Sequence, residues 1–224
     1  MLLNIDGGEH DDEPEELYAL AHVVNVACGG HAGDEASMTR VVRACLANGT
    51  QIAAHPSYAD REGFGRREQT VSLDALSWEI FEQCKALRIV AKNHGAEITA
   101  AKPHGALYHA AHRDAAVADA ILDPITRALH SVSIVGPAGG ALETAARERG
   151  LPYLVEAFAD RGVRADGSLV PRGEPGALIE DPVAAAERAR AIVRAAKANT
   201  ICVHGDTPNA LAIARAVRAV LDGT

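Results

Sequence analysis

Histidine and lysine residues recur directly after short apolar segments of this 224-residue chain. Residues 23–28 run into Gly-Gly-His-Ala-Gly-Asp, which places His31 among glycines, and the segment ending at Ala54 is followed at once by His55. An imidazole at such a position has neither a packing nor a capping role, which favours proton transfer or metal binding. The sequence therefore predicts that the loops after these segments carry the chemistry.

Lys102 ends another apolar segment, and His104 follows two residues later. A buried ammonium without a partner is too costly, so Lys102 must reach either a polar mouth or a carboxylate. We predict that Lys102 stabilises developing negative charge and that His104 shares a proton with it.

Carboxylates follow the first, sixth and last apolar segments: Asp6, Glu9, Glu156, Asp160 and Asp206. Glycines between the first two let the backbone approach a ligand closely, although a solvated turn is the alternative interpretation. Glu156 and Asp160 either act on substrate or pair with Arg161. We expect Asp206 and the neighbouring His204 to face the same mouth.

Residues 56–67 form a long loop that mixes charges of both signs with glycines. The loop is predicted to cover the substrate, and Arg66 and Arg67 are candidate clamps for a carboxylate or phosphate. The alternative is a surface loop with solvated ion pairs.

The elements that must position these residues alternate along the chain. Apolar runs rich in Val and Ile predict strands at residues 2–5, 23–28, 50–54, 97–101, 131–135, 151–155 and 200–203, with helical spacing between them, clearest at 38–46 and 210–221. Asp34, Asp181 and Thr207 are expected to cap helices, and Asn48-Gly49 to close one.

Alternating strands and helices predict a buried parallel sheet with helices outside. An open doubly wound sheet gathers its ligand groups at a few strands, whereas His, Lys, Asp or Glu follow six of the seven predicted strands here. We therefore expect one closed or nearly closed barrel spanning residues 1–224.

Composition limits the partners. The formal net charge is -8 and the basic residues are scattered, which excludes nucleic acid as a main partner. No apolar run approaches the length of a membrane span, and strand-like sequence begins directly after Met1, so we expect no membrane association and a cytoplasmic protein. Four isolated cysteines are expected to be buried apolar groups: Cys28, Cys45, Cys84 and Cys202.

Five blocks, CGGHAGD, HPSYADREGFGRR, KPHGALY, EAFADR and VHGDTP, occur in this order and resemble the LamB/YcsF family across nearly the whole chain. The resemblance implies an α/β fold, an irregular seven-stranded (β/α) barrel of the glycoside hydrolase/deacetylase type. It also implies ATP-dependent cleavage of the small-molecule substrate 5-oxoproline to L-glutamate together with 5-oxoprolinase B and C subunits. Carried over by motif, the site would comprise Asp6, His31, His55, Lys102, His104, Glu156, Asp160, His204 and Asp206.

Three features depart from the family pattern. Gly30 stands where the family usually has a bulky residue, the loop after Glu9 is acidic and poor in glycine, and the region 182–200 is shortened. These departures affect the shape of the pocket and the contacts with partners, and they leave the polar residues at the strand ends intact.

A lactam is a poor electrophile, so ATP would serve to phosphorylate the amide oxygen before water attacks. We predict that Asp6 or His55 activates the water while Lys102 and His104 stabilise the oxyanion and protonate nitrogen. The chain has no G-x-x-x-x-G-K-[ST] stretch, and its glycine-rich turn at 136–140 is a weak phosphate cradle, so ATP is expected to be bound partly or wholly by partners.

Two alternatives from other classes stay open. The first is an ATP-independent amide hydrolase or deacetylase in which Asp6, His31 and His55 bind a divalent metal. The second is a non-catalytic subunit that presents a small molecule to its partners.

Overall fold

Seven parallel strands close into a barrel in the computed structural model, which describes residues 1–164 and 168–223. Each strand pairs with its neighbour in the sequence, and the last pairs with the first. The predicted closed barrel is confirmed, and so is each predicted strand to within a few residues. The strands are β1 (Leu2–Gly7), β2 (Val23–Ala27), β3 (Gln51–His55), β4 (Ile98–Ala101), β5 (Ser133–Gly136), β6 (Tyr153–Phe158) and β7 (Thr200–His204).

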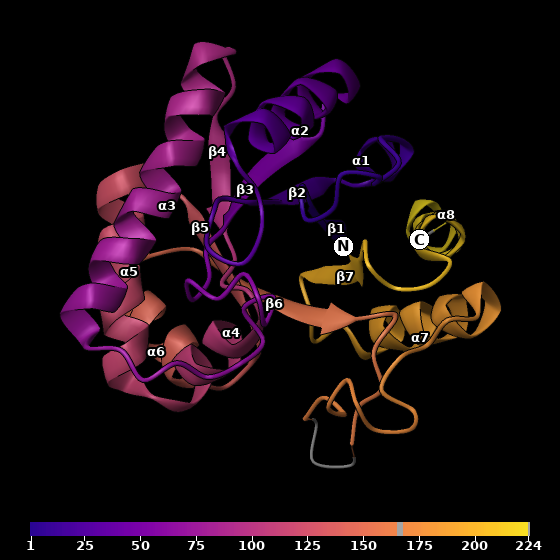
Figure 1. Cartoon of the computed structure of the whole chain (residues 1–224). Coiled ribbons are helices and arrows are strands. Elements are labelled where there is room, and N and C mark those ends of the chain that lie inside the picture. The colour runs from indigo at the N-terminus through magenta and orange to yellow at the C-terminus, as the bar shows by residue number, and fades with distance from the viewer. Residues whose placement is uncertain (165–167, 224) are drawn as a thin grey trace.

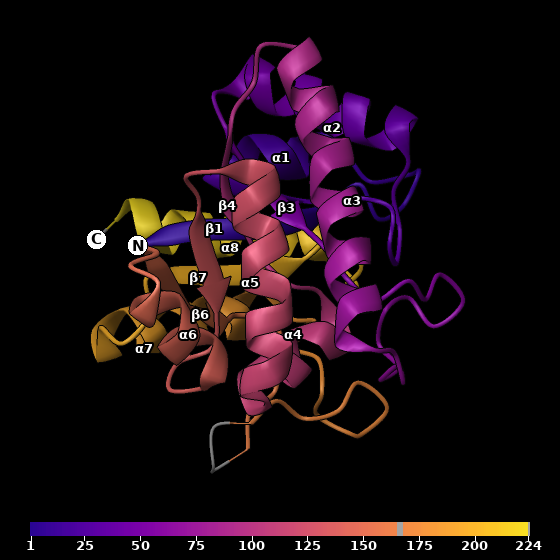
Figure 2. The ribbon, with the colours of Figure 1, turned by 90° about the vertical axis from the view of Figure 1, so that its left-hand side faces the viewer.

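Helices cover the outside of the barrel (Figure 1). Helices α3 and α5 lie side by side in both views, and the indigo start of the chain lies beside the yellow end at β7 and α8 (Figure 2). The helices are α1 (Glu16–Leu20), α2 (Glu35–Asn48), α3 (Leu73–Asn93), α4 (Gly105–Arg113), α5 (Ala115–Leu129), α6 (Ala141–Glu148), α7 (Pro182–Ala195) and α8 (Ala210–Asp222).

Most of the predicted helix ends are confirmed. Asp34 caps α2 by accepting the backbone N–H of Ser37 at 2.8 Å, and Gly49 closes that helix in the left-handed conformation with φ 67°. Asp181 likewise accepts two backbone N–H groups at the start of α7. The prediction for Thr207 was wrong: α8 begins after Asn209, because the Thr207 hydroxyl donates instead to a buried carboxylate of the site, that of Asp160.

The strands alternate between an apolar outer face and an inner face that carries both polar side chains and a small apolar cluster around Val23 and Val135. Leu3 and Ile5 of β1 belong to the large core cluster with the helices, and Val203 of β7 does the same. The intervening residue Asn4 instead bonds to the two neighbouring strands, accepting from Asn25 of β2 at 2.7 Å and donating to Thr200 of β7 at 2.8 Å. Period-two alternation therefore sends polar side chains into the interior of the barrel.

All four cysteines are buried and none forms a disulfide, as predicted, but Cys202 is not a purely apolar group, because its Sγ accepts from Lys102 Nζ at 3.1 Å. Among the described residues, no helix is both long and apolar enough to cross a membrane.

Candidate active site

The loop after β1 is held in place by its own acidic segment. The backbone N–H groups of Gly8, Glu9 and His10 donate to the carboxylate of Glu13 at 2.7 to 2.9 Å. Three N–H donors around one carboxylate form a compact turn. The acidic segment after Glu9 thus includes the residue that orders this loop and holds Glu9 next to the histidines.

Three histidines meet Glu9 at the carboxyl ends of β2, β3 and β4. Glu9 Oε1 lies 2.9 Å from His31 Nε2, 3.3 Å from His104 Nδ1 and 3.8 Å from His55 Nε2. The rings of His31 and His104 are stacked, with centroids 3.6 Å apart and planes 4° from parallel, and Phe64 packs edge-on against both. All four polar side chains are buried, so they interact in a medium of low polarity.

Burial sets the protonation of this group. Desolvation lowers the pKa of His31 to about 3, and the pKa of His104 is lowered well below its usual value by burial and by the neighbouring His31 and His55. Burial and the charge of Asp6 raise the pKa of Glu9 to about 7. The rings of His31 and His104 are therefore neutral at neutral pH.

Lys102 is the centre of a second cluster, inside the barrel. Its Nζ lies 2.8 Å from Asp6 Oδ1, 3.0 Å from Glu156 Oε1 and 3.1 Å from Cys202 Sγ. Burial opposes the charges of Asp6 and Lys102, but their mutual attraction is stronger. The pKa of Lys102 stays well above its usual value, and that of Asp6, which also faces His55, stays well below. Lys102 thus has buried carboxylate partners, which is one of the two arrangements that the sequence predicted.

A third cluster joins Asp160 to His204. Asp160 accepts the backbone N–H of His204 at 2.8 Å and the hydroxyl of Thr207 at 2.7 Å, and it lies 3.1 Å from His204 Nδ1. These contacts outweigh burial and lower the pKa of Asp160. A carboxylate on Nδ1 orients the ring so that Nε2 faces the interior, where it lies 3.9 Å from Asp6 Oδ2.

The two predicted arginine clamps, Arg66 and Arg67, lie apart and have different partners. Arg66 lies at the rim, pairs with Asp206 and places its guanidinium over the Phe64 ring. Asp206 also pairs with Arg172 at 3.2 Å, so two cations occupy its carboxylate. Arg67 instead pairs with Asp60 and is largely exposed, because Asp60 on its own loop is a nearer partner than the mouth.

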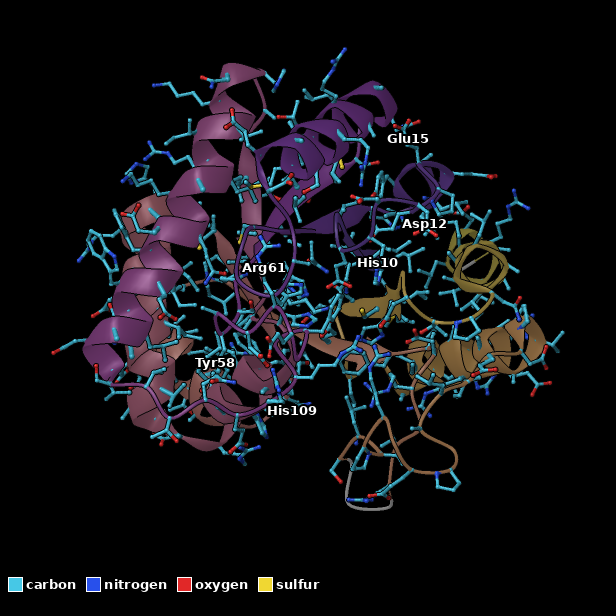
Figure 3. All side chains as sticks on the ribbon, viewed as in Figure 1. His10, Asp12, Glu15, Tyr58, Arg61 and His109 are labelled. Atoms are coloured by element: carbon cyan, nitrogen blue, oxygen red, sulfur yellow. The ribbon has the colours of Figure 1, made fainter. Side chains whose placement is uncertain are left out.

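The structure thus brings Asp6, His31, His55, Lys102, His104, Glu156, Asp160 and His204 together as the sequence predicted, with Arg66 and Asp206 at the rim. Figure 3 shows His10 and Arg61 on the loops after β1 and β3 that surround this mouth. His10 stacks on Phe64, and Arg61 donates to the carbonyl oxygen of Gly33, so both loops contribute to its wall.

The residues that could hold a metal differ from those predicted. One donor atom from each of Glu9, His31, His55 and His104 lies within 4.8 Å of the others, and Asp6 falls in a second group with Cys202 and His204. The predicted set of Asp6, His31 and His55 thus spans two groups. The glycine-rich turn after β5 is occupied by its own helix, since Gly139 N–H donates to Glu143 at 2.7 Å.

Four residues at or around the mouth were missed or underweighted in the sequence analysis. The sequence favoured neither a ligand-binding role nor a solvated turn for Glu9, and it indicated Asn25 only as part of a strand, although Asn25 donates to Asp6 at 2.8 Å. The Phe64 contribution is a backbone carbonyl and carries no side-chain signal. Arg172 lies far along the chain from Asp206, so no local spacing could have linked them.

The neighbours of Gly30 explain why this position has no side chain. A Cβ there would lie 2.3 Å from Ser57 Oγ and 2.5 Å from Gln83 Oε1, and Gln83 bonds the backbone of Ser57 on both sides. The pair of Ser57 and Gln83 therefore fills the space that a bulkier residue would need.

Fold and site together define an α/β barrel of the glycoside hydrolase/deacetylase type, with a buried polar mouth at the carboxyl ends of its strands. A family 4 carbohydrate esterase from Streptomyces lividans, solved in complex with acetate, shares this fold with a TM-score of 0.52 and 16% identity, over 100% of this chain and 88% of that one.

Closer similarity defines the family. The profile of the LamB/YcsF family matches residues 3–224. A protein of Chloroflexus aggregans, named as the A subunit of 5-oxoprolinase, is 43% identical over 98% of this chain and 94% of its own length. The crystal structure of the lactam utilization protein from Thermus thermophilus has a TM-score of 0.91 and 35% identity, over 100% of this chain and 96% of that one. The chain belongs to the LamB/YcsF family, as its motifs predicted.

Proposed function

We propose that this chain is the A subunit of an ATP-dependent 5-oxoprolinase and opens 5-oxoproline to L-glutamate together with B and C subunits in the cytoplasm. The observation that carries the proposal is near-complete similarity, at 43% identity, to the Chloroflexus aggregans protein whose name is that of a 5-oxoprolinase A subunit. The name of the Thermus thermophilus protein, which refers to lactam utilization, supports the same class of substrate.

The chemistry of the mouth suits a small substrate with an amide and a carboxylate. Ring opening consumes one water and ATP hydrolysis consumes another, so one lactam, one ATP and two waters give glutamate, ADP and phosphate. Arg66 at the rim is a proposed partner for the substrate carboxylate. Lys102 stays cationic and is the proposed stabiliser of negative charge on the amide oxygen.

The proton-transfer roles follow from the contacts. Asp6 stays a carboxylate and, with His55 at 3.4 Å, is the proposed base for water. The ring of His104 is neutral, so it fits a proton acceptor or metal ligand better than an acid. His204, which Asp160 orients, is the proposed acid that protonates the leaving nitrogen. Glu156 is proposed to orient the substrate, and His31 is proposed to orient Glu9.

ATP is proposed to be bound partly or wholly by the B and C subunits, because the glycine-rich turn after β5 is filled by Glu143. Asp206 is proposed to act by holding Arg66 at the rim. Arg67 was predicted to bind substrate, but its pairing with Asp60 favours a role in shaping the loop.

The test is glutamate release from 5-oxoproline by the chain mixed with its B and C partners, with and without ATP. We expect release with ATP and none without it. The matched variant is His204→Gln, which should lose turnover, and exposed His94→Gln is its control. No glutamate from partners that are active with another A subunit would refute the proposal.

A second candidate is an amide hydrolase or deacetylase that uses a divalent metal and no ATP. The observation that favours it is the group of three histidines and a carboxylate at the mouth. Amide hydrolysis by the isolated chain without ATP would select this candidate over the first.

A further inference from the structure

Two histidine nitrogens face each other in the mouth, and when both rings are neutral neither of these nitrogens carries a proton. His55 Nδ1 lies 2.7 Å from the carbonyl oxygen of Lys102, and His104 Nε2 lies 2.9 Å from that of Phe64. A carbonyl oxygen can only accept, so both of these nitrogens carry the ring N–H. In neutral rings the other two nitrogens, His55 Nε2 and His104 Nδ1, therefore carry lone pairs, and they lie 3.0 Å apart.

Two lone pairs at this separation repel each other unless a cation lies between them. Glu9 Oε1 adds a third electron-rich atom, 3.3 Å from His104 Nδ1 and 3.8 Å from His55 Nε2. In a tetrahedral zinc site with bonds of ~2.0–2.1 Å, neighbouring ligand atoms lie ~3.3 Å apart. The separations of 3.0, 3.3 and 3.8 Å bracket that value.

The other contacts of the His55 and His104 rings also favour a cation between them. Metal-binding histidines usually donate their second ring N–H to a carbonyl or carboxylate, which fixes the tautomer, and both of these rings do so. The carbonyl oxygen that accepts the His104 N–H belongs to Phe64, which adopts the left-handed conformation with φ 53°. That backbone is unfavourable for a phenylalanine, and it directs the carbonyl at the ring.

His31 belongs to this group but is badly placed as a ligand. Its ring is stacked on that of His104 with centroids 3.6 Å apart and planes 4° from parallel. Imidazole binds zinc through a lone pair in the plane of the ring at ~2.0–2.1 Å, so one ion cannot lie in both planes. His31 Nε2 instead lies 2.9 Å from Glu9 Oε1, where its N–H can orient the carboxylate.

We propose that Glu9, His55 and His104 bind one divalent transition-metal ion, with zinc the best fit, and that His31 orients Glu9 without binding the metal. Three protein ligands leave a position open, and a zinc ion there supplies a Lewis acid for a carbonyl oxygen or a water. The inference concerns binding alone, so it stands whether or not the chain acts on 5-oxoproline.

The test uses the full chain, stripped with a chelator, dialysed and titrated with zinc chloride by calorimetry, with metal content measured by mass spectrometry. We expect one zinc per chain. Glu9→Gln, His55→Ala and His104→Ala should each lower the affinity by more than ~100-fold, since each removes a ligand, whereas His31→Gln should stay within the ~10–100-fold loss typical of an outer partner and still fill to one zinc. Asp6→Asn and the exposed His94→Gln should also bind one zinc.

A second measurement needs no variant and so does not depend on their folding. Long-range nitrogen NMR of the histidine rings should show the proton of His55 on Nδ1 and that of His104 on Nε2, with the opposite nitrogens shifting on addition of zinc. A chain that takes up no zinc, with a shared proton between the two rings, would overturn the proposal. Loss of zinc in Asp6→Asn with retention in Glu9→Gln would overturn it too, in favour of the ligands predicted from sequence.

Discussion

Replacing Lys102 by methionine is the most informative single change to the interior of the barrel. Methionine keeps most of the length of the side chain and removes the cation that lies 2.8 Å from Asp6 and 3.0 Å from Glu156. Both carboxylates are buried, at 2% and 6% exposed, so water cannot replace the lost partner. The change therefore leaves both buried carboxylates without the cation that they share, in a medium of low polarity.

The expected cost follows from this arrangement. Removing one partner of a buried ion pair costs ~3–5 kcal/mol, and a domain of this kind has a total stability of ~5–15 kcal/mol. Lys102 serves two carboxylates, which places the cost at the upper end of that range. The cost should shrink as the pH falls, because the uncompensated carboxylates then take up protons.

Urea unfolding followed by circular dichroism, near neutral pH and at about pH 5, measures the effect. The double variant Lys102→Met/Glu156→Gln removes one of the stranded charges and should recover part of the stability. Lys85→Met is the matched control, since its exposed ion pair with Glu82 is worth little, and it should change stability by less than ~0.5 kcal/mol.

The reasoning would be refuted if Lys102→Met cost less than ~1 kcal/mol near neutral pH, or if the double variant were no more stable than the single one. The same variant tests the reaction. We expect it to abolish turnover in the complex with the B and C subunits, and retained turnover would remove Lys102 from the proposed mechanism.

Three further predictions concern the surrounding residues. Because its pKa is lowered, the Asp160 carboxylate stabilises the fold above about pH 4, and this contribution is lost as the pH falls. The difference in unfolding free energy between the wild type and Asp160→Asn should therefore become smaller in acid. A difference that grows in acid would contradict this explanation. Gly65→Ala should cost ~1–3 kcal/mol in urea unfolding and disturb the His31 and His104 ring signals, because φ is +64° and the new Cβ would lie 2.8 Å from His31 Cβ; unchanged ring signals would speak against this packing. Gly30→Ala should lower the free energy of unfolding by ~1–3 kcal/mol, since its Cβ would crowd Ser57 and Gln83. An unaltered urea midpoint would show that Ser57 and Gln83 can shift to make room for the methyl group.

The strands and the gross position of the site could be predicted because they depend on local patterns. Apolar runs marked each strand, charged residues or histidine followed six of the seven, and parallel strands necessarily bring their carboxyl ends to one edge. The buried partner of Lys102 could also be expected, because an unpaired ammonium in the core is too costly. The identity of that partner, with both Asp6 and Glu156 in contact, came from the structure.

The pairing of residues within the mouth could not be predicted from one sequence. Arg67 and Arg66 are neighbours in the chain, yet one pairs with Asp60 and the other with Asp206. Thr207 precedes a proline like a helix cap, but the Asp160 carboxylate competes for its hydroxyl. The grouping of Glu9 with the histidines depends on the turn that Glu13 holds closed, which is a contact in space rather than a spacing.

The pairing of β1 with β7 has a consequence for how the molecule is made. Leu2 pairs with Thr200 and Asp6 with His204, so the first strand to leave the ribosome gains its second neighbour only when the last strand emerges. Contacts so distant in sequence slow folding, and until they form the nascent sheet has two unpaired edges that can join other chains. The barrel can therefore close only after β7 has emerged, and until then the unpaired edges of the sheet leave the chain prone to aggregation.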